Sequence, residues 1–271
     1  DLAGPQGTSG FRYVVAEDRW EAVPQLPAEA GASSGAVLAG FAYYADVGGN
    51  LHQFNPRTLA IRKIPGDNRA ARDHSQLVAF QGELWLMGGR ASRGVTNGRV
   101  SIFDPASETW RLGPGIASSR SGFAAAASDT MIFVAGGERL DFPTRVITDA
   151  EAFVAGDTQW RALPPLPVGA HGFGGAVQGN AFFTLSGSLV AGGTHAEGQV
   201  QIYDPATNTW TMGAPMSWSA GSLCTAVIGG KIYAAGGITT GGFTVGNCAV
   251  YDPATDGWTA LAAMPDGGRN H

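Results

Sequence analysis

A phrase built on a tight turn and a tryptophan recurs along the chain with a nearly constant period. It reads YDPATNTWTMGAPM from Tyr203 and YDPATDGWTALAAM from Tyr251, and related copies begin at Phe103 and Phe153. The tryptophans of these copies are Trp110, Trp160, Trp210 and Trp258, at intervals of 50, 50 and 48 residues. Such a period is typical of repeat architectures, because one supersecondary unit cannot bury its apolar faces alone and packs against copies of itself.

Two weaker copies lie upstream. FNPRTLAIRKIP, from Phe54, has Ile61 in place of the tryptophan, and YVVAEDRWEAVPQLP, from Tyr13, supplies Trp20. Between the copies run short apolar segments that end in a glycine pair, such as ELWLMGG, MIFVAGG and KIYAAGG, although the fourth repeat reads AFFTLSG. These segments predict strands. The glycines permit positive φ, and the Asp-Pro phrase predicts a tight turn. Each repeat therefore predicts about four short strands.

The glycine pair, the Tyr-Asp-Pro turn and the tryptophan that follows it resemble the kelch repeat. The resemblance extends from about Tyr13 to His271, and five or six copies in register make it specific. It implies an all-β fold, a six-bladed kelch-type β-propeller. Each blade would be a four-stranded sheet, with strands a to d counted from the central channel outward.

The repeat phase predicts how the blades divide the chain. Five complete blades are expected between Gln25 and about Leu261. A sixth blade would take its c and d strands from residues 11–23, and its a and b strands from the C-terminal side, where they are apparently missing because the sequence stops as strand a should begin. The expected organisation is an N-terminal tail over residues 1–10 and a single propeller domain over residues 11–271.

Composition excludes several classes of function. The net charge is −5, Lys63 and Lys231 are the only lysines, and the arginines are scattered, so no nucleic-acid partner is expected. No apolar run is long enough to span a membrane. The N-terminal DLAGPQGTSG has neither a methionine nor a signal peptide and resembles the end of a processed chain, which favours a secreted or extracellular protein. Cys224 and Cys248 are expected on strands a and c of one blade, too far apart for a disulfide.

The kelch resemblance places the d-to-a and b-to-c loops on one face, where ligands commonly bind. Aligned on the glycine pairs, one position holds Ser34, His74, Gly122, His171, Ser222 and His271, and the position two residues earlier holds Arg72, Arg120 and Arg269. These polar side chains indicate either a solvated channel mouth or a ligand pocket. Arginine and serine suit carboxylate or phosphate groups. By resemblance to kelch domains that recognise acidic peptides, the best candidates are Arg72, Arg120, Ser121 and Arg269.

Other side chains are expected on the same face. The b-to-c loops add Arg90, Arg93, Arg139 and Phe142. Trp218 lies in a d-to-a loop, where it would either anchor a partner or a sugar or pack on a neighbouring loop.

A metal ion at the channel mouth is a separate hypothesis. His74, His171 and His271 belong to the second, fourth and sixth blades, which are three-fold related in a six-bladed ring. Three imidazoles and an open water position form a common catalytic zinc arrangement, and the bound water would be acidified. Apart from this hypothesis, no cofactor is expected.

These patterns favour a non-catalytic propeller that binds a protein or peptide partner through the d-to-a and b-to-c loop face. The arginines favour an acidic partner, and a carbohydrate is the alternative ligand. An enzyme acting on a small polar or carbohydrate substrate, of oxidase, epimerase or lyase type, is one alternative, and a structural module of a larger extracellular assembly is another. No phosphate-loop or His-Glu-x-x-His pattern occurs, and no catalytic residue is assigned.

Overall fold

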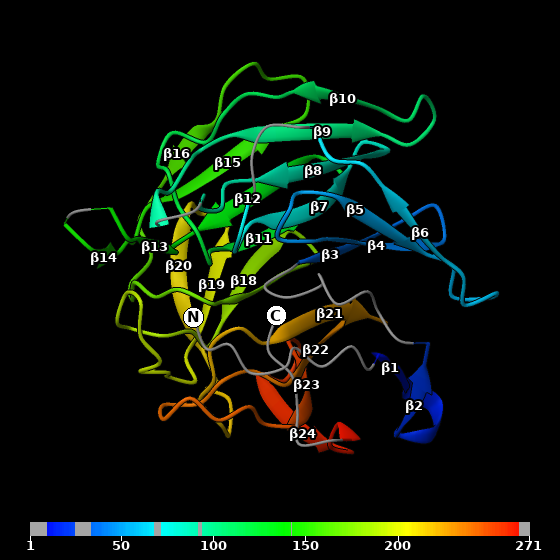
Figure 1. Ribbon diagram of the computed structural model, residues 1–271. Helices are drawn as coiled ribbons and strands as arrows, with labels where there is room; N and C mark the ends of the chain where they lie inside the picture. Colours follow the sequence, from blue (N-terminus) through cyan, green and yellow to red (C-terminus); the bar gives the residue numbers. More distant parts are fainter. Residues whose placement is uncertain (1–9, 25–33, 68–71, 92–93, 142, 266–271) are drawn as a thin grey trace.

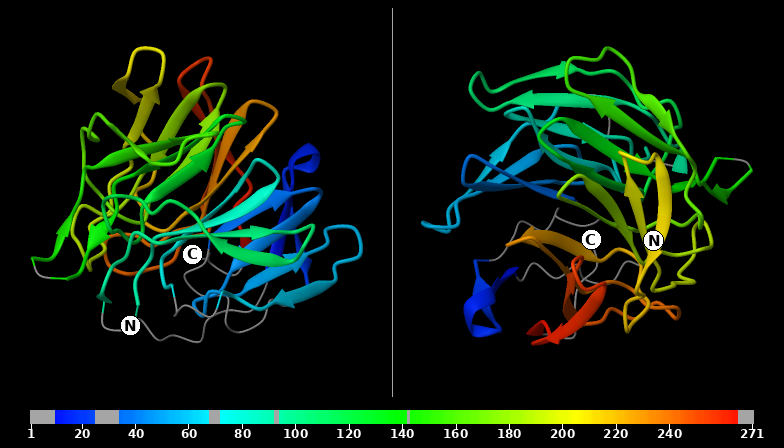
Figure 2. Two further views of the ribbon diagram at one scale, coloured as in Figure 1. Left: turned by 90° about the horizontal axis from the view of Figure 1, so that it is seen from above. Right: turned by 180° about the vertical axis from the view of Figure 1, so that it is seen from behind.

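Five antiparallel four-stranded sheets make up most of the protein. The computed structural model describes residues 10–24, 34–67, 72–91, 94–141 and 143–265. The five sheets, which we call blades I to V in chain order, are arranged as in a β-propeller (Figures 1 and 2). This confirms the prediction of an all-β propeller with five complete blades.

Each blade consists of four strands in chain order, a to d. Blade I contains β3 (Gly35–Leu38), β4 (Phe41–Ala45), β5 (Leu51–Phe54) and β6 (Ile61–Ile64). Blade II contains β7 (Gln76–Phe80), β8 (Glu83–Met87), β9 (Val100–Asp104) and β10 (Thr109–Leu112). Blade III contains β11 (Ala124–Ala127), β12 (Met131–Ala135), β15 (Ala150–Val154) and β16 (Arg161–Leu163). Blade IV contains β17 (Gly174–Gln178), β18 (Ala181–Leu185), β19 (Val200–Asp204) and β20 (Thr209–Gly213). Blade V contains β21 (Cys224–Ile228), β22 (Lys231–Ala235), β23 (Cys248–Asp252) and β24 (Gly257–Leu261).

Two smaller hairpins lie outside the blades. β1 (Gly10–Val14) and β2 (Arg19–Val23) are joined by the 3₁₀ turn η1 (Val15–Glu17), and β13 (Glu138–Arg139) pairs with β14 (Arg145–Val146) inside the b-to-c loop of blade III. Within the described ranges, no helix has the length and hydrophobicity needed to cross a bilayer.

The hydrophobic core is divided into clusters that lie between neighbouring blades. Trp85 of blade II packs against Phe153 of blade III, with ring centroids 5.0 Å apart. Phe133 of blade III stacks on Phe182 of blade IV at 5.3 Å. Because both faces of a blade are covered, strand b reads as a continuous apolar run rather than as an alternating one. The glycine-terminated runs in the sequence are these b strands.

The repeated tryptophans connect successive blades. Trp160 Nε1 of blade III donates to Pro114 O at 2.8 Å, just after strand d of blade II. The equivalent bonds run from Trp110 to Pro65 O, from Trp210 to Pro164 O and from Trp258 to Ala214 O, at 2.8–2.9 Å. Each tryptophan also packs against the aromatic residue that precedes the turn, as Trp210 does against Tyr203 at 5.3 Å. These contacts make the tryptophans part of the scaffold.

The N-terminal hairpin docks on blade V. Residues of β1 and β2 pair in register, with Tyr13 opposite Trp20, which confirms the predicted pairing within residues 11–23. Trp20 Nε1 donates to Ala262 O at 2.8 Å, the contact that the other tryptophans make with the preceding blade. Figure 2 shows this hairpin in dark blue beside the red strand β24.

The two cysteines lie in blade V, on β21 and β23. Cys224 and Cys248 both stand opposite Ala235 of the intervening strand β22. Both thiols are free, as the separation by one strand led us to expect.

Candidate functional site

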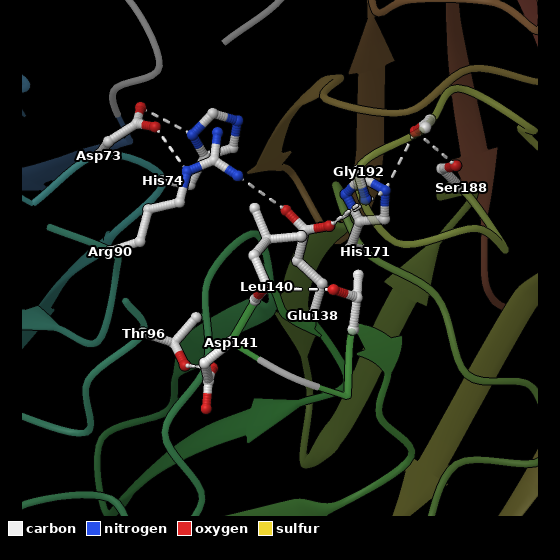
Figure 3. Close-up of polar contacts among 12 residues, drawn as sticks. Asp73, His74, Arg90, Thr96, Glu138, Leu140, Asp141, His171, Ser188 and Gly192 are labelled. Carbon is white, nitrogen blue, oxygen red and sulfur yellow. Dashed lines mark hydrogen bonds and ion pairs between the residues drawn. The ribbon is translucent and has the colours of Figure 1, made fainter. Parts of the chain in front are cut away.

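Two kinds of loop meet at one end of each blade. A residue three positions before the start of strand a forms an isolated β-bridge with the b-to-c loop of its own blade, as Ser121 does with Glu138 and His171 with Ser188. The d-to-a and b-to-c loops therefore share one face, as expected. Figure 3 shows polar side chains from blades II, III and IV converging there.

Backbone hydrogen bonds link neighbouring blades at the start of strand a. Gly122 N donates to His74 O at 3.0 Å, Gly172 N donates to Gly122 O at 2.5 Å, and Ser222 N donates to Gly172 O at 2.7 Å. All four residues have positive φ, between 55° and 67°. His74, Gly122 and Ser222 are thus equivalent, as predicted, but His171 lies one position earlier. That prediction was wrong, because the residue that stands 14 positions before Ser186, as His74 stands before Gly88, is Gly172.

Arg120 lies inside the protein rather than at the channel mouth. Its side chain is fully buried. Nη1 donates to Asp149 O at 2.7 Å and to Gly136 O at 3.1 Å, and Nη2 donates to Glu151 Oε1 at 2.7 Å. The guanidinium therefore satisfies carbonyl and carboxylate oxygens of its own blade, and the prediction that Arg120 would contact an acidic ligand is wrong for this structure.

Arg72 and Ser121 need the same correction. Arg72 is 1% exposed, and it donates to Leu86 O at 2.7 Å and to Ser101 Oγ at 2.6 Å. The Ser121 side chain is also buried, and among the residues that the structure describes its hydroxyl has no hydrogen-bond partner. Because a buried guanidinium is held by fixed acceptors, neither arginine is available to a carboxylate that arrives from solvent.

A chain of charged contacts crosses the face from blade II to blade IV (Figure 3). Asp73 Oδ1 lies 2.7 Å from His74 Nδ1, and Asp73 Oδ2 accepts from Arg90 Nε at 2.7 Å. Arg90 Nη1 donates to Glu138 Oε1 at 3.0 Å, and Glu138 Oε2 accepts from Gly192 N at 2.7 Å. Only 1% of the Glu138 side chain is exposed, so these donors offset the cost of burying its carboxylate. The contacts join the loops of three blades into one unit.

The Asp73 carboxyl should make the stability of the protein depend on acid pH. Burial by itself would raise the pKa of Asp73, but hydrogen bonding and charge from His74 and Arg90 lower that pKa to about 2. A carboxyl whose pKa falls on folding stabilises the folded state above its unfolded pKa of about 3.9, and this contribution is lost as the pH falls towards about 2. Asp73→Asn should therefore be less stable than the wild type at about pH 6, with a difference that shrinks between about pH 4 and 2.

Urea unfolding at a series of pH values measures this dependence. Asp157→Asn is the matched control, because Asp157 pairs with Arg161 on the exposed surface. A stability difference between Asp73→Asn and the wild type that stays constant down to about pH 2 would contradict the prediction.

His171 is held by the b-to-c loop of its own blade. Nε2 lies 3.0 Å from Val190 O and 3.1 Å from Gly193 O, so Nε2 carries a proton and donates to these carbonyls. Among the described residues, no three or more His, Cys, Asp or Glu side chains are grouped as a metal site requires. Because His171 is not equivalent to His74, the predicted three-fold relation between them is wrong.

Trp218 packs inward. Its ring stands edge-on to Trp258 at 6.3 Å, within the core between blades IV and V, and Nε1 donates to Gly236 O at 3.4 Å. Of the two roles predicted for Trp218, the structure favours packing on a neighbouring element.

Ser222 takes part in the site through its backbone. The predicted residues outside the described ranges are Arg93, Phe142, Arg269 and His271.

Apolar side chains at four b-to-c loops were not anticipated from the sequence, which predicted only Phe142 among the apolar residues of these loops. Four of these loops each project one apolar residue into solvent. The residues are Val47, Val95, Val190 and Phe243, with exposures of 37%, 56%, 52% and 74%. A signal was available, because each is an apolar residue among glycine, threonine or other loop-forming residues. Glu138 was also missed, since nothing in its local sequence marks it as buried.

Comparison with solved structures supports the fold. A chain in the structure titled "Structure of YjhT" superposes with a TM-score of 0.79 at 14% identity, covering 94% of this chain and 92% of that one. At this identity the likeness shows the fold alone. The fold and the repeated sequence phrases together define a kelch-type β-propeller.

Sequence comparison extends this result to the family. The Kelch motif profile matches residues 221–265. Kelch-like protein terF of Aspergillus terreus is 37% identical over 212 residues, which are 71% of this chain and 46% of the relative. Alpha-scruin of Limulus polyphemus is 25% identical over 263 residues, 89% of this chain and 28% of the relative. The chain belongs to the kelch-repeat family, and it spans less than half the length of these relatives.

Proposed function

We propose that this propeller is a non-catalytic binding module that holds a protein or peptide partner on the face formed by the d-to-a and b-to-c loops. The observation that carries the proposal is the combination of loops fixed to one another with apolar side chains left exposed at their tips. A surface that is ordered before binding loses little conformational entropy when a partner docks.

Hydrogen bonds between loops of different blades fix this surface. Thr96 Oγ1 of blade II donates to Asp141 Oδ1 of blade III at 2.8 Å. Ala196 N of blade IV donates to Thr240 Oγ1 of blade V at 2.9 Å. Together with the contacts of Glu138, these bonds run from blade II to blade V, so the loops form one continuous rim.

The exposed apolar residues of this rim supply the binding energy in the proposal. A single exposed valine is ordinary on a protein surface. Here, however, four loops of four blades each expose one, and the largest, Phe243, is 74% exposed. An apolar cluster rimmed by polar groups is typical of an interaction surface.

Selection from a displayed random peptide library tests the proposal. We expect bound peptides to lose at least roughly tenfold in affinity for the double variant Val190→Ser/Phe243→Ser, because each buried apolar side chain contributes about 1.5–3 kcal/mol. The matched control is Leu112→Ser/Met212→Ser, which removes two apolar side chains of similar exposure from the outer strands β10 and β20. Peptides that bind the loop variant and the wild type equally would contradict the proposal.

We also propose that the N-terminal hairpin is the outer half of a sixth blade, next to blade V. The support is that the hairpin repeats the contacts of a c–d pair. Asp18 Oδ1 accepts from Ala262 N at 2.7 Å, and Asp256 Oδ1 of blade V accepts from Ala214 N at 2.7 Å in the same way. Both aspartates have positive φ, of 45° and 48°.

If the hairpin is held as a c–d pair, Trp20→Ala should release it from blade V. The expected result is faster limited proteolysis within residues 10–24, because the side chain that bonds Ala262 is lost. Arg12→Ala, which removes an exposed ion pair with Glu21 in the same hairpin, is the control. Unchanged cleavage in Trp20→Ala would contradict the assignment.

A further inference from the structure

The chemistry of the partner follows from how the loop face uses its charges; this inference rests on the binding function proposed above. Arg90 contacts two carboxylates, those of Asp73 and Glu138. In blade III, Arg139 Nη2 donates to Asp141 Oδ2 at 2.7 Å. An arginine whose donors are already taken by carboxylates of its own chain gains little by exchanging them for those of a ligand.

Three further arginines that the structure describes near these loops leave this balance unchanged. Arg72 and Arg120 are buried beneath the face and are hydrogen-bonded to their own blades. Arg145 of β14 is exposed. Among the described side chains of these loops, it is the one best placed to bind a carboxylate of an acidic partner. The expectation of an acidic partner therefore comes to depend on Arg145 rather than on a ring of arginines.

Apolar groups, in contrast, are exposed by the b-to-c loops of blades I, II, IV and V. Val190 of blade IV and Phe243 of blade V belong to adjacent loops that are joined by the bond between Ala196 and Thr240. A ligand that reaches both would bury two of the most exposed apolar side chains of the face. Burial of apolar area gains free energy without requiring charges of opposite sign.

We propose that the partner is an uncharged peptide segment with apolar or aromatic side chains, which seats them against Val190 and Phe243. Binding is then driven by apolar burial, and it depends little on ionic strength, because Arg90 and Arg139 are already paired with carboxylates of the chain. This partner differs in class from the acidic peptide that the arginine positions suggested.

The probe is a phage-displayed library of random peptides of about 12 residues. Peptides are selected for binding to the immobilised wild-type chain. We expect the selected peptides to be rich in Leu, Ile, Phe and Trp, with affinities that change less than about twofold between about 50 and 500 mM salt. Arg145→Ala should leave these affinities within about twofold, whereas Val190→Ser/Phe243→Ser should lower them at least roughly tenfold.

Two adverse outcomes are distinguishable. Acidic peptides that lose affinity roughly tenfold in high salt and in Arg145→Ala would overturn the apolar partner while leaving a binding face in place. Peptides that bind equally well to Val190→Ser/Phe243→Ser would overturn the proposed function itself, and with it this inference.

Discussion

Replacing Arg120 by methionine is expected to lower the free energy of unfolding by about 3–5 kcal/mol. Methionine keeps much of the apolar stem but removes every donor. Glu151, which is 4% exposed, would then lose a charged partner inside the protein, and the carbonyl oxygens of Gly136 and Asp149 would each lose a donor. Removing one partner of a buried pair leaves an uncompensated charge, and this cost dominates the effect.

Chemical denaturation at neutral pH measures this loss. Arg161→Met is the control, because Arg161 pairs with Asp157 at the surface, where an ion pair contributes only about 0–1 kcal/mol. If both variants unfolded at the same denaturant concentration, Arg120 would not be the buried structural group that the geometry indicates.

Trp210→Ala is expected to cost about 3–5 kcal/mol of stability, the range for truncation of a large aromatic side chain in a packed site. The ring of Trp210 lies 5.3 Å from that of Tyr203 and 6.0 Å from that of Phe182. Its Nε1 also donates to Pro164 O of the preceding blade. The substitution therefore removes contacts within blade IV and a bond between blades III and IV.

Trp210→Phe separates the two contributions. Phenylalanine keeps an aromatic ring in the site but cannot donate to Pro164, so we expect a loss of about 1 kcal/mol, the value of one hydrogen bond. Thermal or chemical melts of the two variants give the comparison. A melt of Trp210→Ala that matches the wild type would show that the repeat contact does not hold the blades together.

The arrangement of blades was predictable because its signals are local and periodic. Each tryptophan lies a fixed distance after a turn, and each b strand reads as a short apolar run. In the fourth repeat the alignment failed by one residue. Ser186 has a φ of 57°, like the first glycine of the other pairs, and Gly172 stands 14 residues before it, as His74 stands before Gly88. The prediction gave this position to His171, which precedes it by one residue.

The site was harder to predict because burial depends on partners that are distant in sequence. Arg120 and Arg72 were correctly assigned to equivalent positions, but the sequence alone does not reveal that strand c of each blade supplies the acceptor. Arg120 bonds Glu151, and Arg72 bonds Ser101. A polar residue inside an otherwise apolar c strand was the available signal, since Ser101 and Glu151 are both buried in β9 and β15.

The bond between Trp20 and Ala262 joins residues that are 242 positions apart. The entropy cost of closing a loop grows with its length, and the acceptor becomes available only after blade V has been synthesised. The hairpin therefore precedes all five blades during translation yet docks after them. Among the described residues β1 and β2 pair only with each other, so both edges of the hairpin are open. Ion pairs of Arg12 and Arg19 with Glu21 cover its surface with charge, and charged side chains on an open strand edge oppose aggregation. Because an exposed ion pair contributes only about 0–1 kcal/mol to stability, the charge at these edges is the larger consequence of the ion pairs.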